Sequence, residues 1–174
     1  LDLDSFIDYW IVNTYFCNPD WPGNNIKVWR NLDPNDPSGM DTKWRFILVD
    51  MDSSVAYPQA GGYPNTLAYW DKFNDIAENT RCGAIMYGLC KNVQFREKFV
   101  SRTRYVVDEY FTYEKCAEKL DEMQKGIENL IKYQFMRYAS HGNVNTWSGS
   151  LEVMKDFLAN RREYYLSHLD KHFN

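Results

Sequence analysis

The sequence lacks the features that mark membrane-spanning and nucleic-acid-binding proteins. No apolar run approaches the roughly 20 residues that a membrane-spanning helix needs. Basic residues are not in excess, because 20 Lys and Arg stand against 24 Asp and Glu and the formal net charge is −4. A broad nucleic-acid surface is usually basic, so this charge argues against one. What remains is a globular chain whose 174 residues suit a single domain.

Cysteine is scarce and does not form a metal-binding pattern. Cys17, Cys82, Cys90 and Cys116 are not spaced as Cys-x-x-Cys pairs. An even number would permit two disulfides in an exported protein, but cysteine is also a common small buried residue. The sequence therefore favours free thiols and leaves the disulfide alternative open.

Apolar spacing predicts a mainly helical α+β fold with one small antiparallel β-hairpin and a helical bundle. Asp4 can cap a first helix that ends before Asn18. Ile26–Trp29 and Trp44–Val49 are predicted strands joined by a turn-rich segment, and Tyr57–Asn65 is predicted to be an irregular loop. Further helices are expected at Ala84–Lys91, Gln94–Glu109, Tyr113–Tyr138 and Ser150–His172.

Four side chains with oxygen donors indicate a candidate phosphoryl-transfer site. Asp20 and Asn25 lie on one loop, and Asp50 and Asp52 follow the second predicted strand. Protein kinases combine a catalytic-loop Asp that accepts the hydroxyl proton, an Asn five residues on that binds metal, and a later metal-binding Asp. Hard oxygen ligands suit Mg²⁺. The spacing therefore points to Asp20 as the catalytic residue and to Asn25, Asp50 and Asp52 as metal ligands.

A simple turn is the alternative for the same residues, because Asn, Pro, Asp and Gly commonly form turns. Under the site hypothesis, Asp50 and Asp52 should point to the same side, since side chains alternate along a strand. We expect their carboxylates and that of Asp20 to share one cleft within about 12 Å, as groups that share metal and substrate do.

Longer segments of the chain resemble the CotH kinase family, the spore-coat-protein-H-like proteins. They are SFIDYWIVNTYFCNPDWPGNNIKVWR, KWRFILVDMDSSVA, LCKNVQFREKFVSRTRYVVDEYF and FLANRREYYLSHLDKHF. These segments occur in the family's order and cover nearly the whole chain. The resemblance places Asp20 at the family's catalytic-loop aspartate, and Asp50 and Asp52 at its acidic pair. Asn25 falls where the kinase metal-binding asparagine would lie.

The resemblance implies a protein-kinase-like fold and, in at least some members, phosphoryl transfer from ATP to protein side chains. ATP and Mg²⁺ or Mn²⁺ would be the cofactors and a protein the substrate. The implied setting is extracellular, on the cell surface or envelope, with the spore coat as one example.

Parts of a complete kinase are missing from this sequence. Kinases also need a strand-borne lysine, a glutamate paired with it and a loop over the phosphates, and no Gly-x-Gly-x-x-Gly occurs here. We therefore expect the chain to correspond to the C-terminal lobe of a longer CotH-type kinase domain and to be inactive alone. The alternative is a pseudokinase that serves as a non-catalytic surface or spore-coat-type interaction module.

Overall fold

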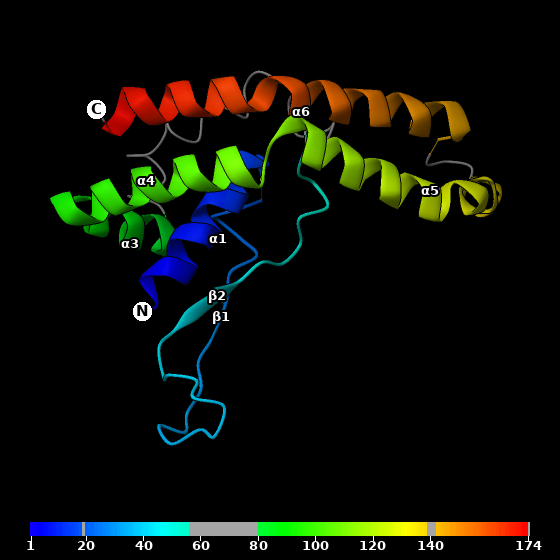
Figure 1. Cartoon of the computed structure of the whole chain (residues 1–174). Coiled ribbons are helices and arrows are strands. Elements are labelled where there is room, and N and C mark those ends of the chain that lie inside the picture. The colour runs from blue at the N-terminus through cyan, green and yellow to red at the C-terminus, as the bar shows by residue number, and fades with distance from the viewer. Residues whose placement is uncertain (19, 56–79, 139–141, 174) are drawn as a thin grey trace.

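The structure is a computed structural model that describes residues 1–18, 20–55, 80–138 and 142–173. The described part is mainly helical with one two-stranded antiparallel sheet (Figure 1), which confirms the expected α+β class. The expected loop at Tyr57–Asn65 lies outside the described residues. The elements are α1 (Leu3–Tyr15), β1 (Lys27–Trp29), β2 (Arg45–Ile47), α3 (Arg81–Cys90), α4 (Val93–Glu109), α5 (Tyr113–Arg137) and α6 (Val144–Phe173).

Helix α1 is the centre of the hydrophobic core. Its N-cap is Asp2, whose carboxylate accepts a hydrogen bond from the Ser5 amide at 3.0 Å. The expectation that Asp4 caps this helix was wrong, because Asp4 already lies in the first helical turn, where a carboxylate favours the helix dipole. The apolar face of α1 is fully buried and comprises Phe6, Ile7, Trp10, Ile11 and Tyr15.

Helices α3, α4 and α6 enclose the core around α1, whereas α5 extends away beside α6 (Figure 1). Helix α4 contacts α1, α3 and α6, and α5 pairs with α6. Apolar side chains from α3, α4 and the C-terminal part of α6 complete the main core; they are Cys82, Met86, Phe95, Phe99, Val106, Val107, Tyr165 and Leu169. Helix α5 extends beyond this core, and none of its 25 residues is buried against the described chain. No helix of the described residues is long and apolar enough to cross a membrane.

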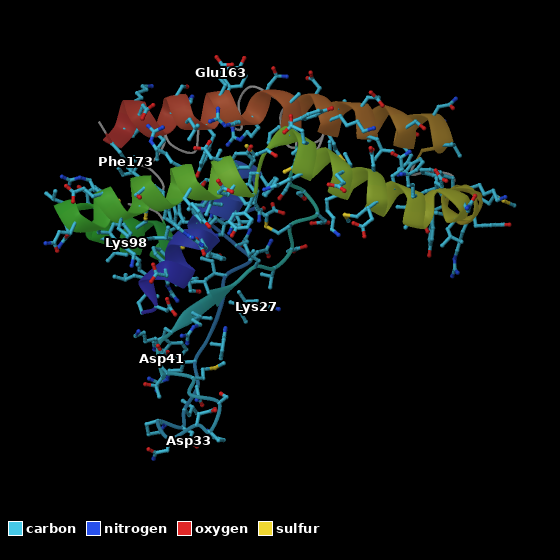
Figure 2. All side chains as sticks on the ribbon, viewed as in Figure 1. Lys27, Asp33, Asp41, Lys98, Glu163 and Phe173 are labelled. Carbon is cyan, nitrogen blue, oxygen red and sulfur yellow. The ribbon has the colours of Figure 1, made fainter. Side chains whose placement is uncertain are left out.

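The hairpin of β1 and β2 is shorter than the sequence predicts, because only three residues of each strand pair, with Val28 opposite Phe46. Its base is fixed to α1, since the Phe46 ring packs against Phe6 at 5.1 Å and Tyr9 at 5.0 Å between centroids. The connecting loop projects away from the helices, and Figure 2 shows Asp33 at its far end. The hairpin thus leads the chain away from α1 and back to it.

Side-chain caps explain where the structure departs from the predicted helix starts. Helix α3 begins at Arg81, before the expected Ala84, because the Thr80 hydroxyl accepts the Gly83 amide at 3.0 Å. Helix α6 begins at Val144 and not at Ser150. There the Asn143 side chain accepts the amides of Asn145 at 2.9 Å and Thr146 at 3.1 Å. The polar residues from Asn143 to Thr146, which precede the expected helix, therefore form its first turn and cap in the structure.

Asn92→Ala is expected to lower the free energy of unfolding by about 1 kcal/mol, the usual cost of losing an N-cap. The Asn92 side chain accepts the Phe95 amide at 3.1 Å and so caps α4, which packs against α1. Urea unfolding followed by circular dichroism measures the change. Asn129→Ala, at an exposed position within α5, is the control. A loss no larger than that of the control would show that the cap does not stabilise the fold.

Candidate active site: two loops at the end of α1 and a neighbouring cavity

The loop that follows α1 carries Asp20; residues 16–25 are called the Asp20 loop. The chain leaves the helix through Cys17, which has a φ of 56°, and a buried asparagine then organises the turn. The Asn18 amide donates to the Asn13 carbonyl at 3.0 Å, and its side-chain nitrogen donates to Asn13 Oδ1 at 3.1 Å. Its Oδ1 accepts the Asp20 amide at 3.3 Å. The Asp20 side chain is exposed.

The second loop, residues 48–55, is called the Asp50 loop and follows β2. Strand β2 ends at Ile47, and Asp50 has a φ of 55°, so Asp50 is not in extended conformation. Strand alternation therefore does not apply to Asp50 and Asp52, because it holds only within a strand. That their side chains point to the same side stays a prediction. Both side chains are exposed.

The two loops touch at the C-terminal end of α1. Asn18 Nδ2 lies 3.3 Å from Met51 Sδ, and the Val55 amide donates to the Phe16 carbonyl at 2.8 Å. Met51 lies between the two candidate metal-binding aspartates in sequence. The contact joins the loop of Asp20 to the loop of Asp50 and Asp52. The more specific expectation, that the carboxylates of Asp20, Asp50 and Asp52 lie within about 12 Å of one another, stays a prediction.

Backbone conformation also distinguishes these loops. In the described chain, the non-glycine residues with positive φ are Cys17, Asn25, Asp50 and Val55, at 56°, 59°, 55° and 58°. Asn and Asp tolerate this region, but for a β-branched residue such as Val55 it is a true outlier. Unfavourable backbone conformations of this kind concentrate at active sites and ligand clamps. Their position in these two loops supports treating them together as one candidate site.

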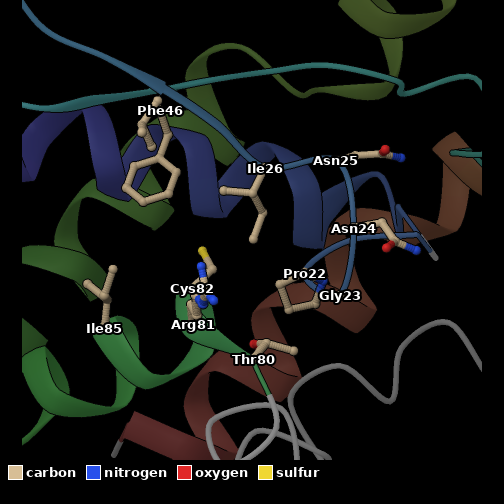
Figure 3. A pocket seen from close by; sticks show the side chains of 11 residues that line it. Pro22, Gly23, Asn24, Asn25, Ile26, Phe46, Thr80, Arg81, Cys82 and Ile85 are labelled. Atoms are coloured by element: carbon tan, nitrogen blue, oxygen red, sulfur yellow. The ribbon is translucent and has the colours of Figure 1, made fainter.

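A cavity of about 690 Å³ lies beside the Asp20 loop, between it, the hairpin and the start of α3 (Figure 3). Its volume falls within the range of small-molecule sites. Asn25 lines this cavity, whereas Asp20, Asp50 and Asp52 do not. The lining residues are Pro22, Gly23, Asn24, Asn25, Ile26, Val28, Phe46, Thr80, Arg81, Cys82 and Ile85.

The α3 side of the cavity was missed by sequence reasoning. Thr80, Arg81 and Cys82 form this wall, and no motif joins them to the Asp20 loop. A Thr followed three residues later by Gly83 is at most a weak sign of a helix start. Burial raises the pKa of the Cys82 thiol to about 12. This thiol therefore stays protonated near neutral pH and is a poor nucleophile.

None of the four cysteines is disulfide-bonded in the structure, in agreement with the favoured prediction. Cys17 is buried in a small cluster with Phe157 and Leu158 of α6, close to the end of α1. Its role is packing, as expected of a small buried residue.

The donor set of the two loops suits a hard divalent cation. The described residues contain no group of three or more His, Cys, Asp or Glu side chains that could hold a metal. Mg²⁺, however, is usually bound by one or two carboxylates together with substrate phosphates and water. Among the described residues, none forms a hydrogen bond or ion pair with the carboxylates of Asp20, Asp50 or Asp52. These oxygen atoms, with the amide oxygen of Asn25, fit Mg²⁺ or Mn²⁺.

Comparison with known proteins assigns the family. The family described as CotH kinase protein matches residues 1–165 of the chain. No curated protein and no solved structure matches it. The family match covers almost the entire sequence, including both loops, the cavity wall and most of α6. The chain belongs to the CotH kinase family.

Proposed function

We propose that this chain supplies the catalytic loop and the metal ligands of an atypical protein kinase, which transfers the γ-phosphoryl group of ATP to protein hydroxyl groups. The observation that carries the proposal is the contact between the two loops, through Asn18 with Met51 and through Phe16 with Val55. This contact joins two loops that carry the residue types that kinases use for proton transfer and for metal binding, and so supports the proposal. Membership of the CotH kinase family supports the same activity.

Asp20 acts as the general base in this proposal. Its exposed carboxylate is not engaged by another described residue, so it is available to a substrate hydroxyl. It accepts the hydroxyl proton while the hydroxyl oxygen forms a bond to the γ-phosphorus. The bond from that phosphorus to the bridging oxygen breaks, and ADP leaves with the electron pair. Catalysis of this kind depends mainly on positioning and on charge stabilisation.

Asn25, Asp50 and Asp52 are the proposed metal ligands. A divalent cation bound by them would neutralise phosphate charge. Asn25 belongs both to the Asp20 loop and to the cavity wall, so it connects the acidic loops with the cavity. Arg81 stands on that wall at the N-terminal end of α3, where the helix dipole favours negative groups. The cavity is therefore a suitable place for polar groups of the nucleotide.

Label transfer from γ-labelled ATP tests the proposal. The full-length protein is incubated with Mg²⁺ or Mn²⁺ and a generic protein acceptor, and labelled protein is counted. We expect transfer that a chelator abolishes. Absence of divalent-dependent transfer from the full-length protein, at millimolar ATP with either metal, would contradict the kinase assignment.

A non-catalytic interaction module is the second candidate. The observation that favours it is an exposed apolar face of α5, where Met123, Ile127 and Leu130 follow helical spacing and are 64%, 47% and 61% exposed. Contiguous exposed apolar side chains commonly mark interaction sites. The label-transfer experiment separates the two candidates, because only a kinase transfers the label.

A further inference from the structure

We propose that Arg161 of α6 is a positioning residue that fixes the Asp20 loop by binding the last turn of α1. The effect of Arg161 on catalysis rests on the proposed function, whereas its effect on the loop does not. Arg161 is distant from Asp20 in sequence and carries no motif. Its assignment comes from the contacts that it makes with the last turn of α1.

The Arg161 guanidinium caps the C-terminal end of α1. Its Nε donates to the Tyr15 carbonyl at 2.6 Å, and its Nη2 donates to the Thr14 carbonyl at 2.6 Å. The last carbonyls of a helix have no partner within the helix, and a cation is favoured at this end of the helix dipole. One planar side chain thus satisfies two such carbonyls at once.

Aromatic rings enclose the same guanidinium. Its central carbon lies 5.7 Å from the ring centroid of Tyr15, 5.6 Å from that of Phe157 and 5.1 Å from that of Tyr165. These distances are within the range of cation–π attraction. Tyr165, one turn after Arg161 on α6, adds a second contact, since its hydroxyl lies 2.7 Å from Thr14 Oγ1. The last turn of α1 is therefore held against α6 at two successive turns.

The Asp20 loop begins from this turn, and the Asp50 loop contacts it. Phe16, the residue after Tyr15, accepts the hydrogen bond from Val55 of the Asp50 loop. Asn13, the residue before Thr14, accepts the hydrogen bonds of Asn18, which in turn contacts Met51. A rotation or shift of the last turn would therefore move the Asp20 loop and the Asp50 loop together.

Burying the Arg161 charge costs free energy that a cap serving stability alone would not recover. The residue is 3% exposed, and no carboxylate of the described residues pairs with it. Its Nη1 atom makes no hydrogen bond within the described part of the chain. Buried charges with incomplete pairing are often no better for stability than apolar side chains of similar size. A fixed geometry at two carbonyls is what the planar guanidinium provides and an apolar side chain does not.

The neighbouring residue offers a matched control. Arg162 points to the surface and pairs with Asp108 at 2.6 Å. Its side chain is 52% exposed, and exposed pairs of this kind contribute little to stability. Arg162→Met thus makes the same chemical change one position along the helix, without touching α1.

Hydrogen–deuterium exchange of the full-length protein tests the proposal. Arg161→Met is expected to raise exchange in the Asp20 loop and the Asp50 loop by about tenfold, with the α4 amides unchanged, as expected for a local opening. Arg161→Lys should give a smaller increase in the same segments, because an ammonium group cannot reproduce the planar fork. Arg162→Met should change neither segment. If Arg161→Met does not fold, Arg161→Lys carries the test.

Kinetics of the same variants connect the loop to catalysis. Arg161→Met should lower kcat by up to about 10²-fold, the cost of a small misplacement of a catalytic group, while KM for ATP changes less than about twofold. Unchanged exchange in both loops would overturn the proposal, as would a uniform rise across the protein. Faster exchange in the loops of Arg161→Met together with a kcat equal to that of an active wild type would also overturn it. If the wild type transfers no phosphate, the proposed function fails, and the exchange data alone decide the role of Arg161.

Discussion

Asp20→Asn is expected to lower the rate of phosphoryl transfer by the full-length protein by about 10²–10⁴-fold, the range for loss of a general base. The fold should remain intact, because the Asp20 carboxylate is exposed and no described residue binds it. Asparagine keeps the size of aspartate and its preference for turns. Label transfer from γ-labelled ATP measures the rate, and thermal unfolding in parallel measures stability.

The control for this variant is Glu128→Gln, which removes an exposed carboxylate from α5. It should leave the transfer rate unchanged and alter stability by no more than about 0.5 kcal/mol. If Asp20→Asn transfers phosphate as fast as the wild type at equal stability, Asp20 is only a turn residue. The interaction module would then become the better account.

Asp50→Asn is expected to raise the divalent cation concentration needed for half-maximal activity by at least about 10–100-fold. Losses of this size follow the removal of groups that merely support metal ligands, and Asp50 is proposed to be a ligand itself. Asparagine keeps one oxygen donor but loses the negative charge. It also tolerates the positive φ of 55° at this position. Initial rates over a series of Mg²⁺ and Mn²⁺ concentrations measure the change.

Asp52→Asn, tested in parallel, shows which of the two aspartates is the main ligand, since the larger shift belongs to it. Asp33→Asn is the control, because Asp33 is exposed on the hairpin loop, at the far end from the helices (Figure 2). It should not move the metal dependence. A metal dependence equal to that of the wild type in both Asp50→Asn and Asp52→Asn would contradict their assignment as ligands.

The bounds of helices with clear apolar spacing and local caps were predicted closely. Helices α4 and α5 begin and end within one residue of the expected bounds, at Val93–Glu109 and Tyr113–Arg137. Asn92 and Thr112 cap them through local hydrogen bonds, which depend on sequence neighbours alone. The start of α6 was missed because Asn143 can serve either a loop or a helix cap. The sequence alone does not show whether Asn143 lies in a loop or caps a helix.

The candidate site was only partly predictable. The spacing of Asp20 and Asn25 pointed to the first loop, and the acidic pair pointed to the second. Their meeting depends on the contact of Asn18 with Met51, two residues far apart in the chain. A tertiary contact of this kind has no local signal. The resemblance to a kinase C-terminal lobe remains a prediction, as no solved structure matches the chain.

The role of Arg161 was beyond sequence reasoning for a similar reason. Arg161 and Arg162 are adjacent and chemically identical, yet one is buried against α1 and the other pairs with Asp108 at the surface. Successive residues of a helix point in directions about 100° apart. The rotation of α6 about its own axis therefore decides which arginine faces α1. That rotation is set by the packing of the whole core and not by the two arginines.

The most direct test of the account is the position of a bound metal. Crystals of the full-length protein grown with Mn²⁺ and a non-hydrolysable ATP analogue would locate the ion by its anomalous scattering. We expect an ion coordinated by oxygen atoms of Asn25 and of Asp50 or Asp52, with the Asp20 carboxylate facing the γ-phosphate. An ion and nucleotide bound elsewhere, or no binding at saturating concentrations, would contradict it.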